Sequence, residues 1–281
     1  MKKKGSTAIL VLIFIAGLAI FAYPTISDRW NALHSSRAIM AYAETISGLS
    51  EEEYEQFYSA AEHYNQNVLE RDNAFNPSEE EKEEYATLLN VENNGVMGYV
   101  EIPIIKVSLP IYHGTSENVL QTAAGHLDWT SLPVGGPSTH TVISGHRGLP
   151  SAELFTKLDR LAEGDRFILY ILNEALTYEV DQIHIVLPED VSDLQITPGK
   201  DYCTLMTCTP YGINTHRLLV RGHRVETETD SSVRVPADAI QMEPLLVAPF
   251  IAAPILLVVF LAMFASDGRQ WDEQLENVID S

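Results

Sequence analysis

Two short stretches of the sequence hold a histidine, a cysteine and arginines in positions that suit acyl transfer. In TVISGHRGLP (141–150), a run rich in β-branched residues ends at a glycine, and His146 follows it. In YCTLMTCTPYGINTHRLLVRGHR (202–224), one predicted strand ends at Cys208, a turn follows, and a second strand begins near His216. A peptide can reach a thiol at a strand end beside a turn, whereas it cannot reach a thiol in the middle of a core strand.

Cleavage of an amide by cysteine needs a thiolate, a proton donor for the leaving amine, and a positive or N–H group for the oxyanion. His146 suits the proton transfer because imidazole changes its charge near neutral pH. An arginine suits the oxyanion because it stays charged and offers several donors. Spacing alone does not separate Arg217 from Arg221, which share a strand face. Taken one at a time, each of these residues also fits a structural role.

The other cysteine, Cys203, lies on the same predicted strand as Cys208. Their odd spacing points the two side chains to opposite faces of the strand, so we predict no disulfide between them. We expect Cys203 to be a buried, structural thiol. No Cys/His spacing typical of a metal site occurs. The formal net charge of −21 would repel a phosphate backbone, which argues against nucleic-acid binding.

Short β-type runs broken by Gly, Pro and Asn fill the chain from Gly95 onward. Many short strands with few helices favour a small barrel or a sandwich. One helix is predicted among them, at residues 152–161, because leucines recur there on one helical face. The predicted strands are residues 96–102, 107–112, 139–144, 166–172, 177–187, 202–207 and 216–225.

The region before the strands, from residue 25 to about residue 90, is charged and is predicted to be helical. Capping boxes at residues 50–53 and 78–81 mark two helix starts. Between them lies ERDNAFNP (70–77), whose Asn-Pro pair predicts a loop with an exposed Phe75. Packing of this ring against the neighbouring helices is the alternative interpretation.

Two uncharged apolar runs lie near the ends of the chain, at residues 7–23 and 245–265. The first follows a lysine cluster at residues 2–4 and fits a membrane anchor or a signal peptide. We favour an uncleaved anchor, since no small-x-small cleavage site follows. The second run is long enough to span a bilayer, and a membrane helix tolerates its prolines. The positive-inside rule then places residues 24–243 outside the cell.

Taken together, these stretches resemble the sortase family. Residues 204–208 match the family's TLxTC motif, Gly145-His146 matches its strand-end histidine, and Arg217 lies where its arginine lies. The similarity covers nearly all of residues 85–225 and is greatest to the pilus-assembling class C sortases. The matching segments are GVMGYVEIP (95–103), LPIYHGTS (109–116), GHLDWTSLPVGG (125–136), SGHRGLPSAELF (144–155) and CTPYGINTHRLLVRGHR (208–224).

The resemblance implies a mainly β fold, the closed eight-stranded sortase barrel, with an α-helical N-terminal extension and a transmembrane helix at each end. Cys208 would attack the Thr–Gly bond of an LPxTG-like sorting signal and form a thioester. His146 would protonate the leaving amine and then deprotonate the incoming one, and Arg217 would orient the substrate and stabilise the oxyanion. In class C the partners are pilin subunits, and a pilin lysine is the acceptor. No cofactor is implied.

Class C sortases often carry a lid in which an Asp-Pro-aromatic motif covers the active site. In this sequence Asp72 and Phe75 are the equivalents that the resemblance suggests, although two residues separate them and no Asp-Pro occurs. The resemblance therefore implies an altered lid, in which we expect Phe75 to block the site.

The predicted layout has six parts. They are a cytoplasmic stub with the N-terminal membrane anchor (1–24), a helical extension with the lid-like loop (25–92), the catalytic barrel (93–228), a linker (229–243), a C-terminal transmembrane helix (244–266) and a cytoplasmic tail (267–281). Such a chain belongs in the cell membrane of a Gram-positive cell.

Two other functions stay open: a sortase that anchors surface proteins to peptidoglycan, and a catalytically silent, membrane-tethered scaffold that binds pilins. A papain-like protease is disfavoured because the cysteine lacks that family's surroundings.

Overall fold

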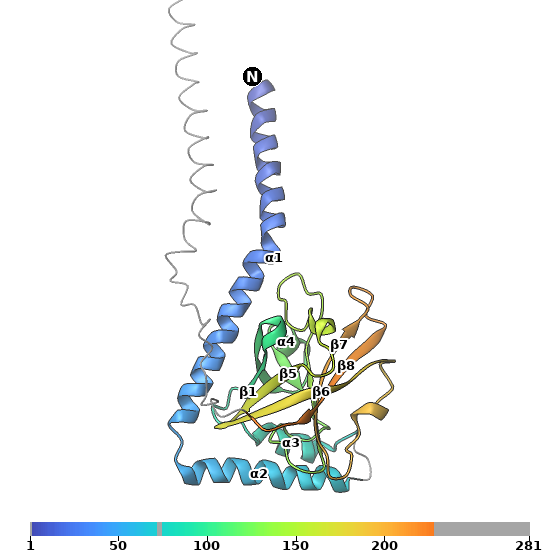
Figure 1. Cartoon of the computed structure of the whole chain (residues 1–281). Helices are drawn as coiled ribbons and strands as arrows, with labels where there is room; N and C mark the ends of the chain where they lie inside the picture. Colours follow the sequence, from blue (N-terminus) through green and yellow to red (C-terminus); the bar gives the residue numbers. More distant parts are fainter. Residues whose placement is uncertain (1, 72–74, 228–281) are drawn as a thin grey trace, which may run out of the picture. The chain divides into compact units, whose positions relative to one another are not determined.

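The computed structural model describes residues 2–71 and 75–227, in which three helices precede a β-barrel (Figure 1). The helices are α1 (Lys2–Ser47), α2 (Glu51–Glu70) and α3 (Glu79–Thr87). The described residues from Ala22 onward belong to one compact unit, and residues 2–21 of α1 belong to a second. The fold of the larger unit is what positions the candidate site.

Eight strands close into a barrel in the order β1-β2-β3-β4-β7-β8-β6-β5, with β5 pairing back to β1. The pairs β2–β3 and β4–β7 are parallel and the other six are antiparallel. This confirms the predicted closed eight-stranded barrel. The strands are β1 (Val96–Ile102), β2 (Val107–His113), β3 (Ala124–His126), β4 (Thr139–Ser144), β5 (Arg166–Ile171), β6 (Glu174–Val186), β7 (Asp201–Thr209) and β8 (His216–Arg224).

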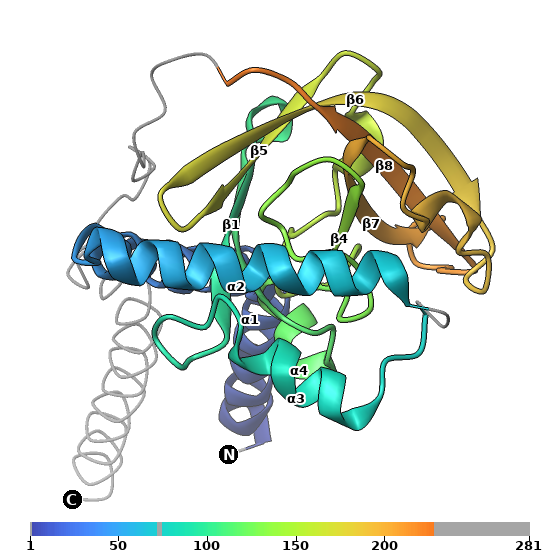
Figure 2. The same ribbon diagram turned by 90° about the horizontal axis from the view of Figure 1, so that it is seen from below.

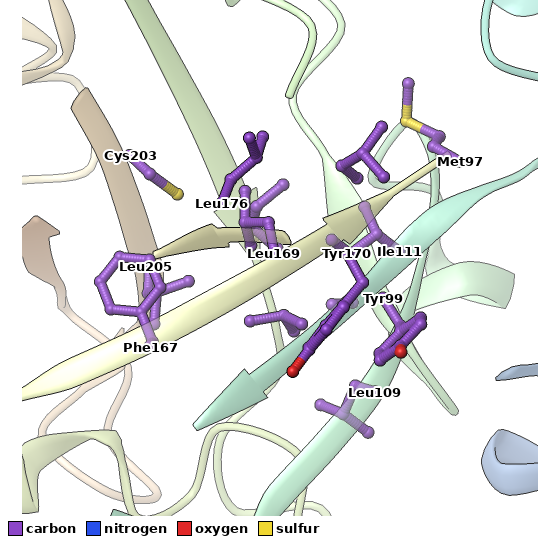
Figure 3. Packing of buried hydrophobic residues seen from close by; sticks show 14 of the residues in the cluster. Met97, Tyr99, Leu109, Ile111, Phe167, Leu169, Tyr170, Leu176, Cys203 and Leu205 are labelled. Atoms are coloured by element: carbon purple, nitrogen blue, oxygen red, sulfur yellow. The ribbon is translucent and has the colours of Figure 1, made fainter. Parts of the chain in front are cut away.

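The barrel interior is filled by alternate side chains of its strands, as the two-residue repeat of a strand requires. Figure 3 shows part of the buried cluster that the barrel strands form; Tyr99 and Tyr170, on the opposite strand face from Val100 and Leu169, stack there with ring centroids 4.5 Å apart. Cys203 lies in the same core and is fully buried. Closure of the barrel leaves no free sheet edge, so the strands that carry the site are held on both sides.

Helices α1 and α2 are fixed to the barrel by specific hydrogen bonds. The Tyr42 hydroxyl on α1 donates to the carbonyl of Met97 at 2.9 Å and accepts from the Leu172 N–H at 2.7 Å. On α2, the Asn65 amide forms two bonds with the backbone of Leu132, at 3.0 and 2.6 Å. In Figure 2, α2 runs across the barrel strands. The helical extension is thus a docked part of the unit.

Both predicted capping boxes are present. Ser50 accepts from the Glu53 N–H at the start of α2, and the Glu53 carboxylate accepts from the Ser50 N–H. Ser78 and Glu81 do the same at the start of α3. These reciprocal bonds satisfy N–H groups that a helix start leaves open.

The predicted helix at residues 152–161 is wrong. These residues form turns that end in one 3-10 turn, η2 (Leu158–Arg160). Leu154 has φ of 39°, which a right-handed helix does not allow. Leu154, Leu158 and Leu161 are all buried. Their spacing therefore reflects burial within an irregular segment, and it does not indicate a helix.

Two further short elements lie between the strands. They are η1 (Pro103–Ile105), which links β1 to β2, and η3 (Ser192–Leu194), which lies between β6 and β7. One turn of helix, α4 (Glu117–Leu120), precedes β3. The strand β3 itself was not predicted, because its three residues are too few to give a periodic pattern.

Among the described residues, α1 is the one helix long and apolar enough to cross a membrane, judged by length and composition. This agrees with the apolar run predicted at residues 7–23. A signal sequence would share these properties. The second predicted span, residues 244–266, and the linker and tail beside it lie outside the described residues.

Candidate active site

Cys208 lies near the end of the central strand β7 and faces away from the barrel interior. Along β7 the burial alternates, so that Cys203 and Leu205 point into the core while Met206 and Cys208 point to the other face. Cys208 is half-buried, whereas Cys203 is fully enclosed. The structure therefore leaves one of the two thiols partly open to a substrate.

His146 follows β4, the parallel neighbour of β7, and the pairing of the two strands continues past the end of β4. The Gly145 N–H donates to the carbonyl of Met206 at 3.0 Å. The Thr207 hydroxyl donates to the carbonyl of Gly145 at 2.7 Å. From the last pair, Ser144 with Met206, the same register continued by two residues leads us to infer that His146 lies beside Cys208 on one face of the sheet.

The residue before the histidine must be glycine. A Cβ at Gly145 would lie 2.7 Å from the ring of Phe155, which is fully buried beneath it. The Phe155 N–H in turn donates to the carbonyl of His146 at 3.1 Å. The core therefore fixes the backbone at the point where His146 leaves the strand.

Arg217 lies on the other side of the cysteine. Its Cα pairs directly with that of Cys208 in the antiparallel register of β7 and β8, so the two side chains share one face. The guanidinium donates to the carbonyls of His216 at 3.2 Å and Asn214 at 3.5 Å. Within the described part of the chain it forms no ion pair, which leaves its charge for a ligand.

The second arginine of this strand face has a different environment. Arg221 forms two hydrogen bonds to the Asp181 carboxylate, at 2.9 and 3.1 Å, and its guanidinium lies 4.2 Å from the ring centre of Tyr202. It lies four residues beyond Arg217 on β8, roughly 13 Å along the strand. Of the two arginines that spacing left open, Arg217 is thus the one that lies beside Cys208.

Glu117 on α4 approaches the histidine and was not found from the sequence. Its Oε2 lies 3.6 Å from the Nε2 of His146, and its other oxygen accepts from the Gln121 amide. The carboxylate is largely exposed and comes from a segment far from His146 along the chain. No spacing pattern links the two residues, so only the fold reveals this contact.

The comparisons with known proteins bear on this arrangement. A family model described as the sortase domain matches residues 100–225. The crystal structure of sortase C1 from Streptococcus agalactiae is 51% identical with a TM-score of 0.66, and the match covers 68% of this chain and 100% of that chain. The chain belongs to the sortase family. Sortases are cysteine transpeptidases, and the fold and the residues beside Cys208 agree with that membership.

Two further relatives show how far the similarity reaches. A sortase C structure from Streptococcus pneumoniae is 44% identical with a TM-score of 0.59, over 68% of this chain and 97% of that chain. A curated sortase A from Streptococcus agalactiae is 32% identical over 120 residues, which are 42% of this chain. The chain spans about half the length of that relative, 48%. Both class C matches cover nearly the whole of the solved chains.

In this sortase, the face of the sheet that carries Cys208 also carries a cluster of apolar side chains, which we call the apolar floor. Met206 and Trp129 pack against one buried cluster on this face. Phe75 lies edge-on to Trp129, with ring centroids 5.1 Å apart, and is 40% exposed. The members of the cluster are Leu127, Val142, Leu194 and Leu219.

A cavity of about 340 Å³ lies beside Phe75 and Trp129. Its lining includes Phe75, Trp129 and His140, and Arg71 at the end of α2. Phe75 therefore contacts the floor of the Cys208 face through Trp129, and it does not pack solely against the helices. Asp72, the other candidate lid residue, lies outside the described residues.

Two buried histidines of this sortase serve the fold. His126 accepts from or donates to the Tyr85 hydroxyl at 2.9 Å and bonds the Ser131 carbonyl at 2.8 Å. His140 bonds the Thr204 hydroxyl at 2.8 Å. Burial lowers the pKa of His126 to about 3 and that of His140 to about 4, so both are neutral at physiological pH.

The environment of Cys203 differs in kind from that of Cys208. Its thiol is enclosed by the barrel core, and this burial raises its pKa well above the usual value, with Asp201 adding to the effect. A thiol held in its neutral form is a poor nucleophile.

Among residues 2–71 and 75–227, no three His, Cys, Asp or Glu side chains gather in a way that could hold a metal ion.

Proposed function

We propose that this sortase is a class C enzyme that cleaves an LPxTG-like sorting signal and joins it to a lysine of a pilin subunit. The observation that carries the proposal is the position of Cys208, with Arg217 directly opposite it on β8 and with His146 just past the end of β4, the strand on its other side. These three side chains supply the nucleophile, the proton carrier and the oxyanion partner that acyl transfer requires.

In the first half of the reaction, the Cys208 thiolate attacks the carbonyl carbon of the signal's threonine. Arg217 donates to the oxygen that becomes negative. His146 protonates the glycine nitrogen, the C–N bond breaks, and a thioester to Cys208 remains. Among the described residues, the Arg217 guanidinium bonds only backbone carbonyls and forms no ion pair, which supports its role as a preorganised donor to the developing charge.

In the second half, a lysine amine of the next pilin attacks the thioester. His146 takes a proton from this amine, the C–S bond breaks, and the thiolate of Cys208 is restored. The product is an isopeptide bond, and repeated cycles give a polymer. The leaving and incoming amines occupy the same place by microscopic reversibility, so one histidine serves both.

The assignment to class C rests on two further observations. The matches to sortase C structures cover 97% and 100% of those chains and 68% of this chain. The helical extension brings Phe75 against Trp129 on the Cys208 face, where a lid would lie. We propose Phe75 as the covering residue of that lid and Asp72 as its acidic member.

The proposed setting is the cell membrane, with the barrel outside the cell. The apolar part of α1 supports an N-terminal anchor, and the sequence at residues 245–265 supports a second one. We propose the six-part layout predicted from the sequence for the whole chain. Two anchors would raise the local concentration of enzyme and membrane-held pilin, which favours a bimolecular joining reaction.

The experiment is polymerisation by the full chain in detergent micelles, with a purified pilin that carries its sorting signal. The proposal predicts a ladder on denaturing gels that disappears in Cys208→Ala and persists in the matched control Cys203→Ala. If acyl-enzyme forms and only a peptidoglycan-precursor amine accepts the acyl group, the enzyme is a wall-anchoring sortase. If neither product appears while pilin still binds, the scaffold function replaces the proposal.

A further inference from the structure

The segment after His146 is a closed loop beside the end of β7, where Arg147 donates to the hydroxyl of Thr209, the residue after Cys208, at 3.3 Å. Its base is pinned by the bond from the Phe155 N–H to the His146 carbonyl. A second bond, from the Gly148 N–H to the Thr156 hydroxyl at 3.1 Å, also joins the two ends of the loop. The barrel core thus fixes where the loop starts and ends, but these bonds leave its outer part to be held by other elements.

The outer part of the loop is held by α1. The Asp28 carboxylate accepts a hydrogen bond from the Glu153 N–H at 2.7 Å. One turn further along α1, the Asn31 amide donates to the carbonyl of Ser151 at 2.9 Å. Both bonds go to the loop's backbone, so they fix its path whatever side chains the loop carries.

The backbone of Leu154 is held in an unusual conformation, between Glu153, which bonds α1, and Phe155, which lies in the core. Leu154 has φ of 39°, in the left-handed region that non-glycine residues rarely adopt, and its side chain is buried. Such a conformation persists where the surroundings impose it from both sides. Here Asp28 holds the preceding residue, Glu153, and the core holds the following residue, Phe155.

We propose that Asp28 and Asn31 are positioning residues for His146: two side chains of α1 set the path of the loop that begins at the histidine. The inference rests on the proposed function, since it assigns these residues a part in the transfer reaction. Neither residue reaches the reacting atoms. They act through the backbone of residues 151–155, which bonds directly to the His146 carbonyl.

The expected effect is on the rate of reaction and not on substrate binding. His146 transfers the proton in both halves of the reaction, so a loosened loop lowers the fraction of complexes with correct geometry. Small misplacements of a catalytic group reduce rates steeply. We expect kcat to fall about tenfold when both bonds are lost, while KM for the sorting-signal peptide stays within about twofold.

The test uses the full chain in detergent micelles, with Asp28→Ala and Asn31→Ala made singly and together. Asp28→Asn keeps an oxygen that accepts from the Glu153 N–H and should restore kcat. Ser36→Ala is the matched control, because its hydroxyl is exposed and bonds only the Ala32 carbonyl within α1. For each variant kcat, KM and the melting temperature are measured with a sorting-signal peptide and an excess of amine.

The inference is supported if kcat falls in the double variant, KM and the melting temperature match those of Ser36→Ala, and Asp28→Asn recovers the rate. It is overturned if kcat stays within twofold of the control. It is also overturned if kcat and the melting temperature fall together, since the bonds then serve only folding. Absence of cleavage by the parent chain would instead contradict the proposed function, so the two failures are distinguishable.

Discussion

Cys208 on β7 and Arg217 on β8 lie directly opposite each other in the antiparallel pairing of the two strands. Side chains opposite one another in such a pair have Cβ atoms about 5 Å apart, within reach of one bound carbonyl group. Because the barrel is closed, neither strand can slide without disrupting its other neighbour. The register of the barrel thus sets the geometry of the site.

Arg217 and Arg221 should respond differently to substitution. Arg217→Ala removes the donor beside Cys208, so we expect kcat/KM for peptide cleavage to fall about 100-fold or more, with the melting temperature unchanged. Arg221→Ala leaves the Asp181 carboxylate without its two hydrogen bonds, so unfolding free energy should fall by about 2 kcal/mol. Peptide-cleavage assays and urea denaturation of both variants measure these effects. The reverse pattern would assign the oxyanion role to Arg221.

The two thiols should differ in reactivity. We expect a maleimide to modify Cys208 in the folded protein and to modify Cys203 only after unfolding, because Cys203 is enclosed and its pKa is raised. Peptide mapping after labelling, with and without denaturant, locates each adduct. Rapid labelling of Cys203 in the native protein would contradict the alternation of β7 on which the site rests.

Removal of the aromatic ring at Phe75 should uncover the site. In Phe75→Ala the edge-on contact with Trp129 is lost, and a contact of this kind contributes about 1 kcal/mol. We therefore expect thiol labelling of Cys208 and peptide cleavage to rise by up to about tenfold. Leu69→Ala is the matched control, since Leu69 lines the same cavity and is exposed. Unchanged labelling and cleavage in Phe75→Ala would end the lid role of this residue.

Stability should fall as the pH is lowered from about 6.5 toward 4. Burial lowers the pKa of His126 to about 3 and of His140 to about 4, whereas both are near 6.5 in the unfolded chain. Below pH 6.5 the unfolded state therefore binds protons that the folded state does not. Each histidine therefore lowers the free energy of unfolding by up to about 1.4 kcal/mol for each unit that the pH falls below 6.5, until the pH reaches its folded pKa.

Urea denaturation between pH 7.5 and 4 tests this expectation. The variant His140→Gln removes one of the two groups, so its stability should depend less steeply on pH than that of the parent. His34→Gln is the control for the substitution itself, because His34 is exposed on α1. An equal slope in the parent and in His140→Gln would show that His140 does not carry the effect.

Local patterns in the sequence were enough to predict much of this fold. The alternation of β7 separated Cys203 from Cys208, and serine–glutamate pairs located two helix starts. Both signals depend only on residues close together along the chain. The barrel's closure came from the family resemblance, since strand periodicity alone allowed a sandwich as well.

The parts that escaped prediction depend on contacts between distant segments. Arg217 and Arg221 have the same strand periodicity, and tertiary contacts distinguish them: Arg217 pairs with Cys208, whereas Arg221 bonds Asp181 on β6. Glu117 reaches His146 from α4, which no spacing reveals. The segment 152–161 has helical spacing of leucines, but Leu154 is held in a left-handed conformation by its surroundings. In each case tertiary structure decided what local sequence left open.

The most direct test of the account is the identity of the covalent intermediate. The full chain is mixed with a sorting-signal peptide, quenched in acid, and its intact mass is measured. The account predicts an added mass equal to the peptide fragment up to threonine less one water. Hydroxylamine should remove this adduct, as it cleaves thioesters, and the adduct should be present in Cys203→Ala and absent in Cys208→Ala. The same adduct in Cys208→Ala, or cleavage that persists in that variant, would contradict it.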